Sequence, residues 1–432
     1  AYLCFSVSSE SHPNLNPSLS LSSAFFKIKP NPHHHHRPSP HPSFHLQEMI
    51  GAFTSRFTQE QTWDWFERAG VKLKVEEDGR CFPVTDRAET VAGALREAAK
   101  RAGVVLELGA RVTALDRRGE DEKGTGQELE RQALWSVHVQ RKQKSGAAEV
   151  LAADAVMLAT GSSPLGYQLA SQQGHSLLKT MPSLFSFRLA RGHALEGLQG
   201  VTLSDVELTL AQSASKTKTN GKRMGANKGN KTHIQRGSLL ITHRGVSGPA
   251  ALRLSSFAAV DLRDCRYMGE LQLRCLPDET LEKVRQTLQQ KFVAGNGLVS
   301  GGANSKYPFA KQIPRRLWAA LAEEATHGRH PCARWSDLRK EEMRRLCDLL
   351  AGQGLSLPFR GKDTNKEEFV TAGGVDLKEV DLRTCESKRC GGLYFGGEVM
   401  NIDGVTGGFN FQSCWTTGFI VGEAVGRAFA SD

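Results

Sequence analysis

Gly391-Gly-Leu-Tyr-Phe-Gly-Gly-Glu398, followed closely by Thr406-Gly-Gly-Phe-Asn-Phe-Gln412, decides the fold of this 432-residue chain. The apolar run 393–395 predicts a strand, and Glu398 stands just beyond its carboxyl end. The glycines predict tight turns, and the apolar segment 413–430 predicts a closing helix. This order places an acid, a glycine-rich turn and a helix N-terminus at one edge of an α/β sheet.

The same stretch carries groups that suit a flavin dinucleotide. The carboxylate of Glu398 can accept hydrogen bonds from ribityl or ribose hydroxyls. Glycines let main-chain N–H groups approach a phosphate or the pyrimidine edge of the ring, and a helix N-terminus stabilises the negative charge of a reduced flavin. The alternative is a glycine-rich turn that only closes a sheet.

Upstream of this stretch, the pattern predicts an α/β nucleotide-binding domain with a β-meander crossover. Helices are predicted at 59–69 and from Asp86 to about Ala102. Strands are predicted at 71–75, 104–108, 112–115, 134–140, 149–152 and 154–159. The last strand is buried and runs into Thr160-Gly161, a turn at which a dinucleotide can cross a sheet, although any strand end can look the same.

The middle of the chain has a different pattern, which predicts an inserted domain at 183–367. Short alternating strands are expected at about 183–263, and helices at 279–292, 312–326 and 337–351. The α/β domain is then discontinuous, with parts at 46–182 and 368–432.

Residues 1–45 are expected to lie outside the fold. They are rich in Ser and Pro with a single acid, Glu10, which is typical of a transit segment and indicates an intracellular organelle, plastid or mitochondrion. The run His33–His36 could hold a metal weakly, but its proline-flanked setting favours an incidental tract, and no metal site is predicted.

Composition excludes several classes of protein. With 39% hydrophobic and 24% charged residues the chain should be largely globular, and no apolar run is long enough to span a membrane. Nine cysteines without a C-x-x-C pair indicate reduced thiols. The net charge of +10 reflects a basic segment at 216–236, whose lack of aromatic residues favours a solvated loop over nucleic-acid binding.

Several blocks in order resemble one known family. They are Gly79-Arg-Cys-Phe-Pro83, Gly237-Ser-Leu-Leu-Ile-Thr-His243 with Gly245-Val-Ser-Gly-Pro249, Phe369-Val-Thr-Ala-Gly-Gly-Val375, and the stretch from Gly392 to Gln412. Over about residues 45–426 the chain resembles the BaiN/YhiN-like FAD-dependent oxidoreductases, also called aminoacetone-oxidase-type flavoproteins. Ala159-Thr-Gly-Ser-Ser-Pro164 looks like a plant-type variant of the family's A-T-G-G turn.

The resemblance implies a glutathione-reductase-type FAD-binding domain with an inserted β-barrel plus helical domain. It implies FAD as cofactor, NAD(P)H or an organic compound as reductant, and hydride exchange with an unidentified small organic substrate. The implied flavin contacts are Val112, Thr160, Gly161, Gly397, Glu398, Asp403, Gly407, Gly408, Asn410 and Gln412. No catalytic residue is assigned: His175 and His243 are candidates that also suit structural hydrogen bonding, and Cys81 is expected in the core.

The sequence departs from the family pattern at its start. No strand followed by G-x-G-x-x-G and a helix precedes the first matching block, and Asn401 stands where the family usually has Asp. Gly295-Asn-Gly297 follows no strand and is rejected as a dinucleotide site. These features predict a truncated chain that lacks the central strand of its sheet and binds FAD poorly. The alternative function is a flavoprotein relic or binding protein without FAD.

Overall fold

The computed structural model describes residues 3–6, 50–76, 79–117, 134–141, 149–211, 232–294, 299, 307–327, 334–363, 370–405 and 408–430. The chain divides into two compact units, which are described separately: unit 1 comprises Ala1–Met181 and Val370–Asp432, and unit 2 comprises Pro182–Phe369. Whether these units fold as autonomous domains with the predicted limits stays a prediction. The basic residues 216–231, the histidine run 33–36 and Gly407 lie outside the described residues.

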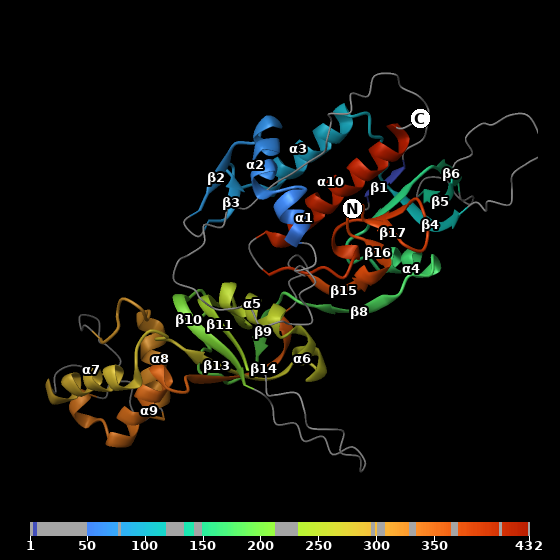
Figure 1. The fold of residues 1–432 in the computed structure, drawn as a ribbon. Coiled ribbons are helices and arrows are strands. Elements are labelled where there is room, and N and C mark those ends of the chain that lie inside the picture. The colour runs from blue at the N-terminus through green and yellow to red at the C-terminus, as the bar shows by residue number, and fades with distance from the viewer. Residues whose placement is uncertain are drawn as a thin grey trace, which may run out of the picture. The chain divides into compact units, whose positions relative to one another are not determined.

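A five-stranded sheet, in the order β1-β7-β18-β17-β16, forms the centre of unit 1 (Figure 1). Its strands are β1 (Leu3–Ser6), β7 (Val156–Ala159), β18 (Leu393–Phe395), β17 (Glu386–Ser387) and β16 (Val380–Asp381). β7 and β18 run parallel although more than 230 residues separate them, so their carboxyl ends meet at one edge. This edge holds Thr160 and Glu398.

The predicted meander is present as a separate three-stranded antiparallel sheet of β4 (Ala110–Arg117), β5 (Trp135–Arg141) and β6 (Glu149–Ala153). Trp135, Val137 and Val139 alternate inward along β5, as the sequence pattern indicates. Two-stranded sheets pair β2 (Leu73–Val75) with β3 (Cys81–Pro83), and β8 (Leu177–Pro182) with β15 (Thr371–Val375).

Helices complete unit 1: α1 (Ile50–Ser55), α2 (Gln59–Arg68), α3 (Ala88–Arg101), α4 (Pro164–Gln172) and α10 (Phe409–Ala430). α2 begins with a capping box, in which Thr58 Oγ1 accepts from the Gln61 N–H and Gln61 Oε1 accepts from the Thr58 N–H. α10 contributes Ile420 and Val421 to the core that also contains β7 and β18. The helix that follows the glycine-rich turn is therefore anchored on the sheet.

Two sequence predictions differ from unit 1 as observed. Residues 104–108 do not form a strand, and Val105 and Leu108 are 81% and 83% exposed. Their apolar pattern has no neighbouring strand to pair with among the described residues, so the pattern alone does not produce one. Conversely, Leu3–Ser6 lies in the segment expected outside the fold, yet it forms β1 and pairs antiparallel with β7, because an edge strand offers unpaired N–H and C=O groups.

Unit 2 contains a closed six-stranded barrel, which confirms the predicted inserted barrel with helices. The barrel order is β10-β11-β12-β9-β14-β13, and every pairing is antiparallel. The strands are β9 (Ser186–Leu189), β10 (Thr202–Ala211), β11 (His233–Ile241), β12 (Gly245–Ser247), β13 (Met268–Arg274) and β14 (Leu355–Asp363).

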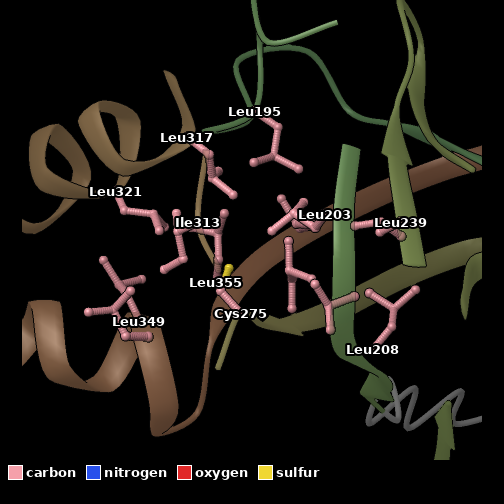
Figure 2. Close-up of a cluster of buried hydrophobic side chains, with 14 of the residues drawn as sticks. Leu195, Leu203, Leu208, Leu239, Cys275, Ile313, Leu317, Leu321, Leu349 and Leu355 are labelled. Carbon is pink, nitrogen blue, oxygen red and sulfur yellow. The ribbon is translucent and has the colours of Figure 1, made fainter. Parts of the chain in front are cut away.

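The helices α7 (Leu281–Ala294), α8 (Arg315–Ala325) and α9 (Lys340–Ala351) share one hydrophobic core with the barrel. Figure 2 shows Leu317, Leu321 and Leu349 of the helices on the same side-chain cluster as Leu203 and Leu208 of β10. Because each element buries its apolar face against the others, unit 2 has a continuous interior.

The prediction of strands alone at 183–263 is wrong, because α5 (Pro249–Phe257) and α6 (Ala259–Asp264) lie within this range. Pro249 occupies the first turn of α5, where its missing N–H costs no hydrogen bond. Ala250, Ala251 and Leu254 are completely buried, so this short helix is apolar on its barrel-facing side and resembles a strand in a simple hydropathy pattern.

Among the described residues, no helix is long and apolar enough to cross a membrane.

Candidate functional site

The turn from β7 into α4 carries two hydroxyl groups that the fold leaves without partners. Thr160 Oγ1 and Tyr167 Oη are buried, and neither has a hydrogen-bond partner among the residues that the structure describes. Gly161 connects the strand to the helix with φ +58°, a left-handed conformation that favours glycine. Buried hydroxyls normally have partners, so an unpartnered pair at a strand end indicates a place for a ligand.

Glu398 lies at the carboxyl end of the neighbouring strand β18. Its Oε1 accepts a hydrogen bond from the Thr371 N–H at 2.7 Å. Its Oε2 points toward the β7–α4 turn, since a Cβ on Gly161 would lie 3.8 Å from it. Burial raises the pKa of Glu398, with the Thr371 N–H opposing the shift. The carboxylate is therefore a strong acceptor with one side still available.

Gly397 brings the main chain close to the first turns of α10. Its φ is +68°, and a Cβ at this position would lie 2.8 Å from Cys414 Sγ. The Gly397 N–H donates to Thr417 Oγ1 at 2.9 Å. Cys414 is exposed as a residue, but local desolvation of its thiol, with a smaller contribution from the Glu398 charge, raises the pKa of Cys414 to about 11. Cys414 is thus a neutral thiol beside the carboxylate at neutral pH.

The loop that enters α10 is held by its own side chains. Asn410 Oδ1 accepts from the Gly404 N–H at 2.8 Å, and Asn410 Nδ2 donates to the Gly404 carbonyl at 3.0 Å. Asp403 is buried, and Gly408 has φ +87°. Asn410 therefore ties the start of α10 to Gly404, and the roles of these residues as flavin contacts stay predictions.

Two further predicted contacts are placed elsewhere in unit 1. Gln412 is buried, and its amide nitrogen donates to the Phe57 carbonyl, Thr62 Oγ1 and Thr416 Oγ1 at 3.1–3.3 Å. It therefore ties α10 to the segment between α1 and α2. Val112 lies in β4, next to a register shift in its pairing with β5. The cofactor roles of both residues also stay predictions.

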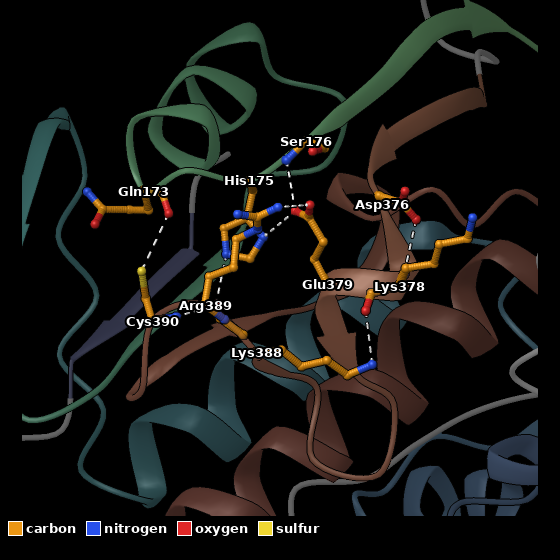
Figure 3. Close-up of polar contacts among 10 residues, drawn as sticks. Gln173, His175, Ser176, Asp376, Lys378, Glu379, Lys388, Arg389 and Cys390 are labelled. Atoms are coloured by element: carbon orange, nitrogen blue, oxygen red, sulfur yellow. Dashed lines mark hydrogen bonds and ion pairs between the residues drawn. The ribbon is translucent and has the colours of Figure 1, made fainter.

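His175 lies just after the C-terminal end of α4. It belongs to a polar cluster that we call the His175 cluster: His175, Ser176, Glu379, Ser387 and Arg389. Ser387 Oγ lies 2.8 Å from His175 Nε2, and Glu379 Oε2 lies 3.3 Å from His175 Nδ1. Figure 3 shows the Glu379 carboxylate between His175, the Ser176 N–H and Arg389. Arg389 is the largest cause that lowers the pKa of Glu379, to about 2.

The His175 cluster has the order hydroxyl, imidazole, carboxylate, but its contacts indicate a structural role. Ser387 Oγ also accepts from the Arg389 and Cys390 N–H groups, at 3.0 and 2.8 Å. Its proton is then directed to His175 Nε2. His175 Nδ1 has no hydrogen-bond partner in the described structure and lies at ion-pair distance from Glu379. Burial lowers the pKa of His175, which is consistent with a neutral ring. His243 is exposed in the β11–β12 turn of unit 2.

The change from Asp to Asn at position 401 is explained by one hydrogen bond. Asn401 is buried, and its Oδ1 accepts from the Gly373 N–H at 2.9 Å. A carboxylate oxygen can accept the same bond, so position 401 requires an acceptor and need not be an acid. Cys81 is buried in a hydrophobic cluster with Phe66 and Val71, as expected.

The group formed by Thr160, Gly161, Tyr167 and Glu398 is called the Glu398 site from here on. Its two unpartnered hydroxyls and partly free carboxylate fit a polyhydroxylated ligand such as the ribityl or ribose part of FAD. The described residues contain no group of His, Cys, Asp and Glu that could hold a metal ion. Tyr167 was not among the flavin contacts expected from the sequence, although it stands one helical turn after Ser163, just beyond the block Ala159–Pro164.

The chain belongs to the HI0933-like family of FAD-dependent Rossmann proteins. The family's description is HI0933-like protein Rossmann domain, and the match covers residues 40–424. This confirms the sequence resemblance and, at the level of the family, a flavin-dependent oxidoreductase.

Three curated relatives align along most of the chain. The ribosomal RNA dihydrouridine synthase of Escherichia coli (strain K12) is 28% identical, with 84% of this chain and 78% of the relative covered. The same-named protein of Haemophilus influenzae is 24% identical over 89% and 85%. The 3-dehydro-bile acid delta(4,6)-reductase of Clostridium scindens is 26% identical over 85% and 80%.

Proposed function

We propose that this protein is an FAD-dependent reductase that adds hydride to a carbon–carbon double bond next to a carbonyl group, with NAD(P)H as the reductant. The observation that carries the proposal is the Glu398 site, where unpartnered polar groups converge at the carboxyl ends of β7 and β18. Ligands of open α/β sheets bind at this edge.

The reaction class is supported by what the relatives' names have in common. Dihydrouridine differs from uridine by two hydrogen atoms across a double bond conjugated with a carbonyl. A 3-oxo compound with double bonds at positions 4 and 6 has the same conjugation. For this chain we therefore propose the same balance: the double bond gains one hydride and one proton, and NAD(P)H loses the hydride.

The residues of the site have separable tasks in this proposal. FAD, when bound, supplies the hydride-transfer chemistry. Glu398 accepts hydrogen bonds from cofactor hydroxyls, while Gly161 leaves room for a ligand close to the main chain. The N-terminus of α10 offers a positive end of a helix dipole to negative charge on the cofactor. The hydride comes from NAD(P)H through FAD, and the proton that the double bond also gains comes from water in this proposal, because no catalytic acid is assigned among the residues of the protein.

The experiment is anaerobic mixing of FAD-loaded protein with NADPH or NADH, followed by an enone such as a 3-oxo-4-ene steroid. Bleaching of the flavin absorbance on mixing and its return after addition of the enone are expected. Mass spectrometry should find a product with two additional hydrogen atoms. A flavin that neither nicotinamide reduces, or a reduced flavin that no enone reoxidises, would contradict the respective half of the proposal.

A second candidate substrate is uridine in ribosomal RNA. It is favoured by the two relatives with that named activity and by the net charge of +10, which suits a polyanion. Incubation of the FAD-loaded protein with unmodified ribosomal RNA transcripts and NADPH, then nucleoside mass spectrometry, separates the candidates. Dihydrouridine at a defined position, with no enone reduction, would select RNA over a small organic substrate.

The alternative function is a binding protein without FAD, favoured by the absence of a G-x-G-x-x-G turn between a strand and a helix in residues 1–432. Equilibrium dialysis against FAD decides this question before any assay of activity.

Residues 1–45, with their Ser-rich and acid-poor composition, support a further proposal of targeting to a plastid or mitochondrion. A fluorescent protein fused to residues 1–45 that stays in the cytosol would contradict it.

A further inference from the structure

We propose that Tyr167 is a cofactor-positioning residue, whose phenol hydroxyl binds the ribityl hydroxyl chain of the flavin together with Glu398. The inference rests on the cofactor of the proposed function and adds a residue and a contact to it. Tyr167 was not among the residues that the family resemblance implied.

The first observation is the state of the hydroxyl itself. Tyr167 Oη is buried, and it has no hydrogen-bond partner among the described residues. Burial raises the pKa of Tyr167 to about 12, so the phenol keeps its proton and remains a donor across the physiological range. A buried donor without a partner is unfavourable in the folded protein alone. A ligand that accepts this bond removes the penalty.

The second observation is the neighbour of the hydroxyl. After burial, the charge of Glu398 is the second cause that raises the pKa of Tyr167. Tyr167 Oη makes no hydrogen bond to Glu398 in the described structure, so a ligand hydroxyl could accept from the phenol and donate to the carboxylate. The local backbone supports this placement, because Tyr167 lies in α4, which starts directly after the turn that faces Glu398 Oε2.

The third observation is a second hydroxyl on the same turn. Thr160 Oγ1 is also buried without a partner. A Cβ on Gly166 would overlap Thr160 Oγ1, so the threonine side chain folds onto the first turn of α4, next to the residue that precedes Tyr167. The strand end and the helix that follows it therefore contribute two buried hydroxyls that have no partner in the described structure.

The charges of the site select the part of the cofactor that fits. A phosphate group beside Glu398 would be repelled by a carboxylate that is paired in the described structure with one N–H only, from Thr371. A chain of neutral hydroxyls has the opposite property, because each hydroxyl can donate to the carboxylate and accept from a phenol or threonine. Within FAD, the ribityl chain and the adenosine ribose both carry neutral hydroxyls. The ribityl chain is the part assigned to Tyr167, and an FAD analogue without a ribityl hydroxyl distinguishes the two.

The test measures FAD affinity of the full chain, by quenching of flavin fluorescence or equilibrium dialysis, for the wild type and Tyr167→Phe. Loss of one buried hydrogen bond is expected to raise the Kd by about tenfold. The matched control is Tyr394→Phe, which removes a buried phenol hydroxyl from β18 beside Glu386 and away from Glu398. It should leave the Kd unchanged within about twofold.

A second measurement separates cofactor binding from a structural role. Because the Tyr167 hydroxyl has no partner in the described structure, Tyr167→Phe should not lower the Tm of the FAD-free protein. Only the increase of Tm on adding FAD should shrink, since that increase follows the affinity. An FAD analogue without the ribityl hydroxyl that Tyr167 binds should show the same Kd for the wild type and Tyr167→Phe.

The possible failures are distinguishable. If the wild type does not bind FAD, the proposed function fails and this inference fails with it. If the wild type binds FAD but Tyr167→Phe binds equally well, the inference alone is overturned. An equal Kd with a lowered Tm of the FAD-free variant would show that the hydroxyl has a structural role.

Discussion

The Glu398 site and the His175 cluster lie in the same unit and contain the same kinds of chemical groups. They differ in how many hydrogen-bond and ion-pair partners their polar atoms have. In the His175 cluster, Ser387 Oγ has three polar neighbours and Glu379 interacts with Arg389, Ser176 and His175. In the Glu398 site, the carboxylate has one N–H donor, and Thr160 and Tyr167 have no partner in the described structure.

The pKa shifts of the two carboxylic acids follow this difference. Arg389 and the Ser176 N–H lower the pKa of Glu379 to about 2, whereas burial raises the pKa of Glu398. Most polar atoms of the His175 cluster have hydrogen-bond partners within the fold, with His175 Nδ1 as the exception, so the cluster suits a structural role. The two hydroxyls of the Glu398 site have none in the described structure, which favours a ligand there. The residue types alone do not distinguish the two.

The largest effect is expected from Gly397→Ala, because the change affects the backbone of the Glu398 site. The positive φ and the 2.8 Å approach of a Cβ to Cys414 Sγ should together lower the free energy of unfolding by about 3 kcal/mol. FAD binding should weaken as well. Urea unfolding and FAD titration measure the two quantities, and unchanged values in both would break the assigned role of this turn.

Glu398→Gln should separate binding from stability at the same site. Its amide oxygen can still accept from the Thr371 N–H, but the charge that hydroxyl donors prefer is lost, so the Kd for FAD should rise by about 10- to 100-fold. The FAD-free variant should be as stable as the wild type or more stable at neutral pH, since a buried charge is removed.

The pH dependence checks the sign of this prediction. The folded pKa of Glu398 is raised, so the wild type gains stability as the pH falls through that pKa toward the unfolded value near 4.5. Glu398→Gln should lack this gain. A variant that is less stable than the wild type at pH 7 and binds FAD normally would place Glu398 with the structural residues.

Glu379→Gln is the corresponding change in the His175 cluster and should have the reverse outcome. The loss of charge-assisted hydrogen bonds to Arg389 and Ser176 should lower stability by about 1.5 kcal/mol at pH 7, without a change in the Kd for FAD.

The folded pKa of Glu379 is lowered, so its contribution is present above about pH 4.5 and disappears as the pH falls through about 2. Urea unfolding at pH 7 and at low pH should therefore show a smaller difference between Glu379→Gln and the wild type in acid. A weakened affinity for FAD would contradict the separation of the two clusters.

Gly422→Ala should have the smallest effect and serves as a control for Gly397→Ala. Gly422 is exposed within α10, and a Cβ there meets nothing within 4 Å. Higher helix propensity should raise the free energy of unfolding by about 0.5–1 kcal/mol and leave the Kd for FAD unchanged. A destabilised variant would indicate that α10 tolerates no side chain on this face.

Helices and strands with strong local sequence patterns could be predicted without the fold. The apolar run at 393–395 is strand β18, Glu398 follows its end, and helices were predicted close to where α2, α3, α7, α8, α9 and α10 lie. Periodicity and glycine spacing reflect interactions between residues that are close in the sequence, so both can be recognised without the fold. The same local blocks were sufficient to identify the family.

Which polar residues have hydrogen-bond partners could be learned only from the fold. Gln412 is bound to Phe57 and Thr62, and His175 to Ser387 more than 200 residues away, while Tyr167 Oη has no partner in the described structure. Residues 104–108 likewise have a strand pattern but no strand, because pairing depends on a neighbour that the pattern does not contain. Hydrogen bonds and burial between distant segments are properties of the folded chain. The sequence therefore indicates which residue types can bind a ligand, and the fold determines which of them lie together.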